Sequence, residues 1–433
     1  MKARKLFTVL GAIAVILLAS APHPSAQTPN VVIEWNRMLQ TLFPGTGPGL
    51  QLRSLPMMHI AMFDAINSFE EVYTPYLGGV KSSRGASAEA AAATAAAATA
   101  ARDVLAALYP AQVAMFDQLL SSQLAGMPRG LVKQGEAVGH AVAAAVLEWR
   151  QNDGWPATQA LVTTPDPTYV LPTIAGFWQP TPPANSFATF TFYPNVKPFA
   201  MTTSRQFVPP PPPTLTSADY AADFNEVKLL GSATSAARTA DQTLMAQVHA
   251  GVNTQIGFFH VWNRVAADVA ERQGLSLIDT ARTFVLLSVA LHDGLQTSFT
   301  SKFTYGLWRP VTAIRRAAED QNAATDADAA WTPLLTTPPY PTYAGNAACL
   351  AAASARALEI AFGRDRIPFT VTYLRTMGLP TQIRSFTGFS DLAQQQADSR
   401  IFGGIHFRFD SEASQTYCAK VPEFTADHFM LLR

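Results

Sequence analysis

Charged residues are scarce in this chain, and neither sign is in excess. Only 14% of its 433 residues are Asp, Glu, Lys or Arg, and 31 basic residues balance 31 acidic ones. A chain without a net field does not attract nucleic acid or an anionic membrane, so neither is an expected partner. With 48% hydrophobic residues the chain can form a large core, and the expected partner is a small molecule.

Long hydrophobic runs are also missing beyond the N-terminus. Three basic residues among the first five precede the apolar run Leu6–Ala19, which is typical of a secretory signal peptide. We predict a signal peptide over residues 1–26, cleaved after Ala26, and an exported protein, either periplasmic or extracellular. An uncleaved anchor is the alternative, but the run is shorter than the roughly 20 residues that cross a bilayer. No span is expected in the remaining 407 residues (433 − 26).

Cysteine is nearly absent as well. Cys349 and Cys418 are the only two, and they do not have the spacing of metal ligands. A thiolate metal centre is therefore not expected.

Strand-like alternation of useful length is absent, and helical periodicity dominates instead. We predict an all-α protein with helices at Met57–Phe69, Ala86–Leu108, Val132–Arg150, Ala266–Val289 and Ala347–Phe362, and from Ser411 onward. Ser217 or Asp219 is a candidate N-cap, and Thr239 to Gln242 has the pattern of a capping box.

A change of composition divides the helical regions. Pro, Thr and aromatic residues dominate from Pro165 to Pro213, where five consecutive prolines favour a stiff polyproline II segment. We predict two helical bundles, 27–160 and 215–433, bridged by residues 161–214. The aromatic residues of the bridge either pack on the helices or line a substrate channel.

Three short motifs follow one another in the last third of the chain. They read Lys302-Phe-Thr-Tyr-Gly-Leu-Trp-Arg309-Pro310, Pro341-Thr-Tyr-Ala-Gly345-Asn346 and Ser399-Arg400-Ile-Phe-Gly-Gly404-Ile-His406-Phe-Arg-Phe-Asp410. Together they resemble the motifs shared by vanadium-dependent haloperoxidases and type 2 phosphatidic acid phosphatases. The first and third match in full, whereas the second has Ala344 in place of Ser and Asn346 in place of His. The resemblance extends to residues 58–67, 177–183 and 222–227, and so covers most of the chain.

The resemblance implies a two-bundle helical fold and a vanadate cofactor, and phosphate could occupy the same site. It assigns vanadate binding to Lys302, Arg309, Gly345, Asn346, Arg400 and His406, with His406 as the axial ligand of vanadium. The residue types suit an oxyanion, because Arg offers a rigid fork of donors and Lys a compact charge. Pro341 to Gly345 also leads into a helix that we expect to begin near Asn346, and a helix N-terminus favours an anion. Alternatively, Asn346 is simply the N-cap of that helix.

His406, Asp410 and Asn346 are the candidate catalytic residues. His406 and Asp410 are four residues apart, which on a helix places both on one face. A neighbouring carboxylate fixes the tautomer of an imidazole, so that the other nitrogen can ligate vanadium or attack phosphorus. Asn346 cannot transfer a proton near neutral pH, and His260 or His292 could replace it. Asp293 is a candidate partner for one of the cations.

Three functions fit these residues. The first is a vanadium haloperoxidase-like enzyme that uses hydrogen peroxide, a halide and an organic acceptor. The second is a phosphoester hydrolase that acts through a phosphohistidine at His406. The third is an oxyanion-binding protein whose catalysis is weakened by Asn346. The sequence leaves the oligomeric state open, a homo-oligomer included.

The two cysteines each follow one of these motifs. If the second and third motifs bind one anion, the helices after them begin close together. A Cys349–Cys418 disulfide is then expected in an oxidising compartment, and two buried thiols are the alternative.

Overall fold

The computed structural model describes residues 30–42, 48–78, 89–155, 165–255, 258–374 and 378–433. The predicted signal peptide and the first residues of the helix predicted at Ala86–Leu108 lie outside these ranges. The helices are α1 Val31–Thr41, α2 Pro48–Glu70, α3 Glu89–Leu108, α4 Val113–Leu124, α5 Arg129–Trp149, α7 Ala218–Leu230, α8 Ala240–Gln255, α9 Phe258–Gln273, α10 Leu277–Tyr305, α11 Pro310–Arg315, α12 Asn346–Phe362, α13 Phe389–Phe402, α14 Arg408–Cys418 and α15 Lys420–His428. Short 3-10 turns occur at Pro110–Gln112, Tyr193–Asn195 and Ala317–Glu319. The predicted helical fold is confirmed.

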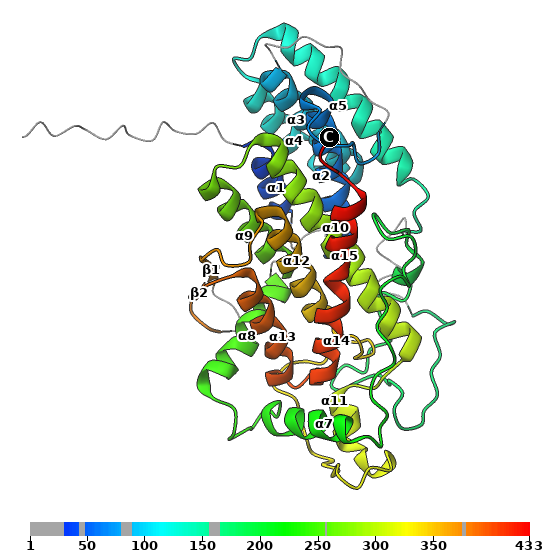
Figure 1. Cartoon of the computed structure of the whole chain (residues 1–433). Helices are drawn as coiled ribbons and strands as arrows, with labels where there is room; N and C mark the ends of the chain where they lie inside the picture. The colour runs from blue at the N-terminus through cyan, green and yellow to red at the C-terminus, as the bar shows by residue number, and fades with distance from the viewer. Residues whose placement is uncertain (1–29, 43–47, 79–88, 156–164, 256–257, 375–377) are drawn as a thin grey trace, which may run out of the picture.

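The molecule is elongated (Figure 1). Helices α1 to α5 lie at one end and the short helices α7 and α11 at the other, while α10, α12 and α15 run along the middle. Helix α10 is buried from Ile278 to Lys302 at nearly every position, and it packs against α2 on one side and α12 on the other. A helix that is apolar on all faces is stable only inside a core. Helix α10 therefore joins the two bundles and carries Lys302 to its C-terminal end.

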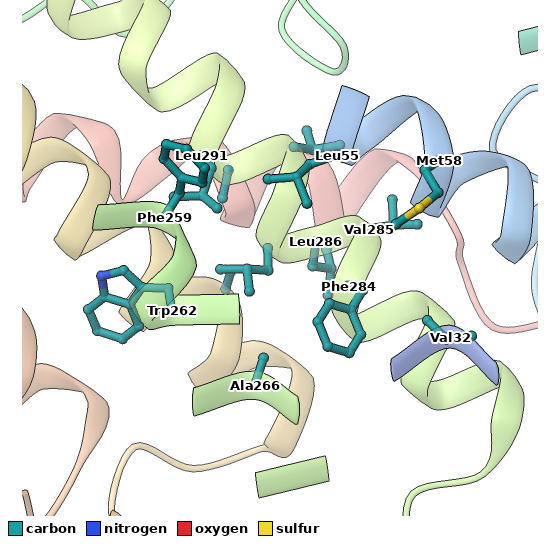
Figure 2. Packing of buried hydrophobic residues seen from close by; sticks show 14 of the residues in the cluster. Val32, Leu55, Met58, Phe259, Trp262, Ala266, Phe284, Val285, Leu286 and Leu291 are labelled. Carbon is teal, nitrogen blue, oxygen red and sulfur yellow. The ribbon is translucent and has the colours of Figure 1, made fainter. Parts of the chain in front are cut away.

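The centre of the core is where α10 meets α1, α2 and α9. Figure 2 shows Phe284 and Leu286 of α10 among Val32, Leu55 and Trp262, which come from those three helices. Each of the five is at most 1% exposed. Because this one cluster also includes residues of α12, the anion motifs are attached to the same rigid core as the N-terminal helices.

Helix α3 is the Ala-rich helix, and residues Ala90–Leu108 are long and apolar enough to cross a membrane by length and composition alone. Of the window tested, 61% is buried inside the protein, as in the core helix of a soluble protein. Gly135 and Gly139 of α5 face it, and a Cβ at Gly135 would lie 2.5 Å from the backbone oxygen of Ala92. Small residues on both helices therefore allow the two backbones to approach closely.

Two predicted details are wrong. The helix predicted at Ala266–Val289 is divided into α9 and α10, because Gly274 adopts a positive φ of 63° and the Ser276 side chain caps α10 by accepting from Asp279 N (3.1 Å). The chain also contains an antiparallel hairpin, β1 Phe369–Tyr373 paired with β2 Gln382–Phe386. By contrast, the predicted caps are confirmed at Ser217, whose side chain accepts from Tyr220 N, and at Thr239, whose backbone and side chain exchange hydrogen bonds with Gln242.

The Pro-rich bridge covers the C-terminal end of α10. The backbone oxygens of Pro209 and Pro210 accept hydrogen bonds from the hydroxyls of Tyr305 (2.8 Å) and Tyr343 (2.7 Å). The proline run thus lies directly over the first two motifs.

Candidate oxyanion site

The three motifs meet in one buried site. Lys302 lies in the last turn of α10, Arg309 is the N-cap of α11, and Arg400 lies in the last turn of α13. His406 directly precedes the N-cap of α14. Lys302 and Arg309 are 0% exposed, Arg400 5% and His406 1%. Residues about a hundred positions apart in sequence are therefore brought together away from solvent.

Lys302 and Arg309 are held by backbone carbonyls rather than by carboxylates. Lys302 Nζ donates to the backbone oxygens of Pro341 (3.0 Å) and Thr342 (2.6 Å). Arg309 donates through Nε to Tyr340 O (2.7 Å) and through Nη1 to Ile405 O (2.8 Å). Neither cation has a carboxylate within 4 Å in the described part of the chain, and Arg309 Nη2 is buried there without a hydrogen-bond partner. The site therefore retains positive charge and at least one donor for a ligand.

Tyr340 lies against these cations, and sequence reasoning missed it. Its ring centroid is 5.4 Å from Lys302 Nζ and 5.0 Å from the guanidinium carbon of Arg309. Both distances are within the range of a cation–π contact. Its hydroxyl accepts a hydrogen bond from Asn346 Nδ2 (3.1 Å), which leaves the hydroxyl proton available for donation. The only sequence signal was its place directly before the second motif.

The hydrogen bonds of His406 define its tautomer. Arg309 Nη1 lies 3.1 Å from His406 Nε2, and because a guanidinium only donates, Nε2 must accept. The proton is then on Nδ1, which lies 2.9 Å from Asp410 Oδ2. Burial and the nearby cations Arg309, Lys302 and Arg400 lower the pKa of His406 well below its ordinary value. The imidazole is thus neutral, with its basic nitrogen turned toward Arg309.

Asp410 orients His406, although the two do not share a helix as the spacing suggested. Asp410 is the third residue of α14, while His406 lies before it. Asp410 Oδ2 also accepts from Phe407 N (3.0 Å) and from the hydroxyl of Thr342. Thr342 Oγ1 lies 3.1 Å from His406 Nδ1 too. Thr342 is a second residue that the sequence motifs did not reveal, because it lies two positions before Ala344, the first residue that was compared with the second motif.

The second motif differs in detail from what the sequence suggested. Gly345, not Asn346, is the N-cap of α12, and the N-cap alternative for Asn346 is wrong. Gly345 N donates to Asp410 O (3.0 Å), so this N–H already has a partner within the chain. A Cβ at Gly345 would lie 3.5 Å from His406 Nδ1. The N-terminus of α12 therefore lies beside His406, and its dipole favours an anion there.

The third motif is shaped by a close backbone contact. Gly404 has a positive φ of 74°, and a Cβ there would lie 2.3 Å from Gly231 O at the end of α7. Only glycine fits this turn, which connects Arg400 to His406. Arg400 Nε donates to Ser399 Oγ (3.0 Å), so the serine of the motif orients the arginine.

The other candidate histidines lie elsewhere. His260 Nε2 is 2.5 Å from Gln51 Oε1 in the packing of α9 on α2. His292 Nδ1 is 2.9 Å from Asp293 Oδ1, and Asp293 accepts from the backbone N–H groups of Phe199, Ala200 and Met201. These buried groups hold the bridge against α10. The expectations that His260 or His292 replaces the missing acid–base group, and that Asp293 supports a site cation, are therefore wrong.

The electrostatics of the site fit a bound oxyanion. Burial lowers the pKa of Lys302 well below its ordinary value, and it lowers the pKa of Arg309 and of Arg400 to about 10. Burial raises the pKa of Asp410 to about 6, although Thr342 and Lys302 oppose this. One carboxylate cannot balance three buried cations, whereas an anion among them would compensate their lost hydration. No group of three or more His, Cys, Asp or Glu suited to a metal cation occurs among the described residues.

The two cysteines form a disulfide in the structure. In the structure Cys349, in the first turn of α12, is bonded to Cys418 at the end of α14. The bond joins the helix that follows the second motif to the helix that follows the third.

Comparison with known proteins agrees with this fold. Residues 282–433 match the family model described as the VCPO second helical-bundle domain. A vanadium chloroperoxidase from Curvularia inaequalis is 23% identical in an alignment that covers 96% of this chain and 85% of that protein. Among solved structures, a bacterial vanadium-dependent iodoperoxidase superposes with a TM-score of 0.74 at 23% identity, covering 94% of this chain and 98% of the other. A holo-type bacterial vanadium-dependent chloroperoxidase gives 0.69 at 16% identity, covering 93% and 94%.

The resemblance to the vanadium haloperoxidases is therefore confirmed, and the chain has their helical fold. Residues 282–433, from within α10 to the end of α15 and beyond, are the part that matches their family model.

Proposed function

We propose that this protein is a vanadium-dependent haloperoxidase-like enzyme that is exported from the cell. The observation that carries the proposal is the neutral His406, whose Nε2 accepts from one buried guanidinium while Asp410 holds the proton on Nδ1. Because Nε2 carries no proton, its lone pair would ligate a metal after exchanging the hydrogen bond from Arg309 for the metal. Positive charge around it is supplied by Lys302 and Arg309, which have no carboxylate within 4 Å in the described part of the chain.

The protein residues would divide the work as follows. Lys302, Arg309 and Arg400 would bind the oxygens of vanadate, and His406 Nε2 would bind vanadium. Bound vanadate supplies a Lewis-acid centre that activates hydrogen peroxide toward a halide. Asp410 keeps Nε2 unprotonated, and the three cations stabilise negative charge in a site from which water is excluded.

The difference between this chain and the motifs at Asn346 concerns proton transfer. Asn346 has no titratable proton, so it can orient a ligand but cannot act as acid or base. Tyr340 is a candidate for proton transfer in its place, since its hydroxyl lies 3.1 Å from Asn346 Nδ2 and its ring contacts Lys302 and Arg309. Slow turnover is therefore expected, because a well-placed acid or base contributes about 10² to 10⁴ in rate.

The proposal is tested with protein purified free of vanadate and then loaded with it. Peroxide-dependent oxidation of iodide and bromide is measured beside hydrolysis of 4-nitrophenyl phosphate, for the wild type and for His406→Ala. Halide oxidation that needs both vanadate and His406 supports the proposal. Hydrolysis without vanadate would instead support attack on phosphorus by His406 Nε2, and saturable vanadate binding without either activity would identify an oxyanion-binding protein.

A further inference from the structure

Thr342 lies where the three motifs meet, and each of its polar groups has a partner there. Its backbone N–H donates to Leu307 O (3.0 Å), and its backbone oxygen accepts from Lys302 Nζ (2.6 Å). Its hydroxyl contacts both His406 and Asp410 of the third motif. Thr342 is 0% exposed. One buried residue therefore connects the lysine of the first motif to the histidine of the third.

The hydroxyl of Thr342 supports one tautomer of His406. A hydroxyl has one proton and two lone pairs, and this one donates its proton to Asp410 Oδ2. The same oxygen lies 3.1 Å from His406 Nδ1, so it can only accept there, which requires a proton on Nδ1. Arg309 imposes the same tautomer from the other side of the ring, where Nε2 accepts its N–H. The hydroxyl thus favours the state in which Nε2 is unprotonated.

The hydroxyl also orients the carboxylate of Asp410. Oδ2 of that carboxylate accepts from the Thr342 hydroxyl, from Phe407 N (3.0 Å) and from His406 Nδ1 (2.9 Å). Oδ1 is buried without a hydrogen-bond partner among the described residues. Hydrogen bonds to an ionised carboxylate are the strong ones. Loss of one of these three donors should therefore loosen the carboxylate and the imidazole that it holds.

We propose that Thr342 is a positioning residue for His406, whose hydroxyl holds the imidazole in the tautomer and orientation in which Nε2 would bind vanadium. The inference rests on the proposed function for the role of vanadate, whereas the orientation of the ring does not depend on it. Partners that orient a metal-ligating His typically contribute about 10- to 100-fold to metal affinity. Thr342 shares Nδ1 with Asp410, so the hydroxyl alone should contribute about tenfold.

The test compares two substitutions at Thr342 with a matched change elsewhere. Thr342→Val keeps the branched shape and removes the hydroxyl, whereas Thr342→Ser keeps the hydroxyl. Thr337→Val is the control, because Thr337 is only 6% exposed and its hydroxyl has no hydrogen-bond partner in the described part of the chain. In calorimetry Thr342→Val should bind vanadate about tenfold more weakly and phosphate as the wild type does. Thr342→Ser and Thr337→Val should bind both anions as the wild type does.

A double substitution shows whether Thr342 acts through the histidine. In protein that already carries His406→Ala, Thr342→Val should leave the vanadate affinity unchanged, because the ring that the hydroxyl orients is gone. A merely structural contribution of the hydroxyl would persist in that background. Weakening of vanadate binding that persists there would overturn the inference.

Proton NMR of vanadate-free protein, labelled with nitrogen-15 in its eight histidines, gives a readout that needs no anion. The His406 Nδ1–H signal is identified by its loss in His406→Ala. This proton should exchange with water about tenfold faster in Thr342→Val than in the wild type, because a looser ring exposes it more often, and at the wild-type rate in Thr342→Ser and Thr337→Val. Absence of the Nδ1–H signal from the wild type, or an unchanged rate in Thr342→Val, would overturn the inference.

Equal weakening of vanadate and phosphate binding by Thr342→Val would overturn it as well. Circular dichroism verifies the folding of each variant, and Thr342→Ala, which also removes the hydroxyl, decides if Thr342→Val does not fold. Wild-type vanadate affinity that His406→Ala leaves unchanged would contradict the proposed function instead, and the exchange rate of the Nδ1 proton would still decide the role of Thr342.

Discussion

The substitution Asp410→Asn distinguishes a site in which His406 binds vanadium from a site that binds any oxyanion equally. Asp410 Oδ2 lies 2.9 Å from His406 Nδ1 and holds the proton there. The amide of Asn can present its own N–H groups to Nδ1, which favours the tautomer with the proton on Nε2. That tautomer cannot accept from Arg309 and cannot donate an electron pair to vanadium. Loss of a partner that orients a metal-ligating His typically costs about 10- to 100-fold in affinity, or about 1.4 to 2.8 kcal/mol.

Phosphate provides the contrast, because it forms no coordinate bond to Nε2. Removing the carboxylate also removes one negative charge among three cations, so Asp410→Asn should bind phosphate as tightly as the wild type or more tightly. Calorimetry with vanadate and with phosphate gives both affinities. Asp223→Asn is the matched control, since Asp223 Oδ2 accepts from Phe409 N (2.6 Å) at the same helix start but does not touch His406. Equal weakening of vanadate and phosphate by Asp410→Asn would refute the reasoning.

Three further predictions concern the departure from the motif, the disulfide and a buried histidine. Asn346→His should raise vanadate-dependent halide oxidation tenfold or more with little change in anion affinity, whereas Asn346→Ala should not; fast wild-type turnover that Asn346→His leaves unchanged or lowers would contradict this. Removing the Cys349–Cys418 bond with two Ala substitutions should lower the free energy of unfolding by about 2 to 5 kcal/mol in denaturant titrations, and two reactive thiols in denatured, unreduced wild type would show that the bond does not form. Burial lowers the pKa of His59 to about 3, so the stability that its neutral imidazole contributes above pH 6.5 is lost as the pH falls toward 3. Between pH 7 and pH 5, urea titrations should show that the free energy of unfolding falls by about 2 kcal/mol less for His59→Leu than for the wild type. Equal losses in both proteins would contradict the assignment.

Much of the fold could be predicted because its signals are local. Helical periodicity and caps such as Ser217 and Thr239 depend on neighbouring residues only, and they were found. The hairpin was missed although Phe369 to Tyr373 alternate buried and exposed side chains, because five residues are too few to separate a strand from a loop. The break between α9 and α10 was missed because a single Gly inside a periodic pattern does not by itself end a helix.

The candidate site could be predicted only as far as the motifs name its residues. The resemblance of the motifs assigned Lys302, Arg309 and His406 to one site. In the structure Arg309 hydrogen-bonds to His406, and Lys302 and Arg309 lie against the Tyr340 ring. The motifs do not name Thr342 or Tyr340. The role of Thr342 depends on contacts with residues 64 and more positions away, and the role of Tyr340 depends on the packing of its ring over a cation. The functional alternatives for His260 and His292 failed for the same reason: residue type does not reveal which side chain lies opposite.

Anomalous X-ray diffraction from crystals soaked in vanadate tests the central claim most directly. We expect one vanadium peak per chain within coordination distance of His406 Nε2, with oxygens bound by Lys302, Arg309 and Arg400. A peak bonded to another residue, or no peak at vanadate concentrations that saturate the protein in solution, would contradict it.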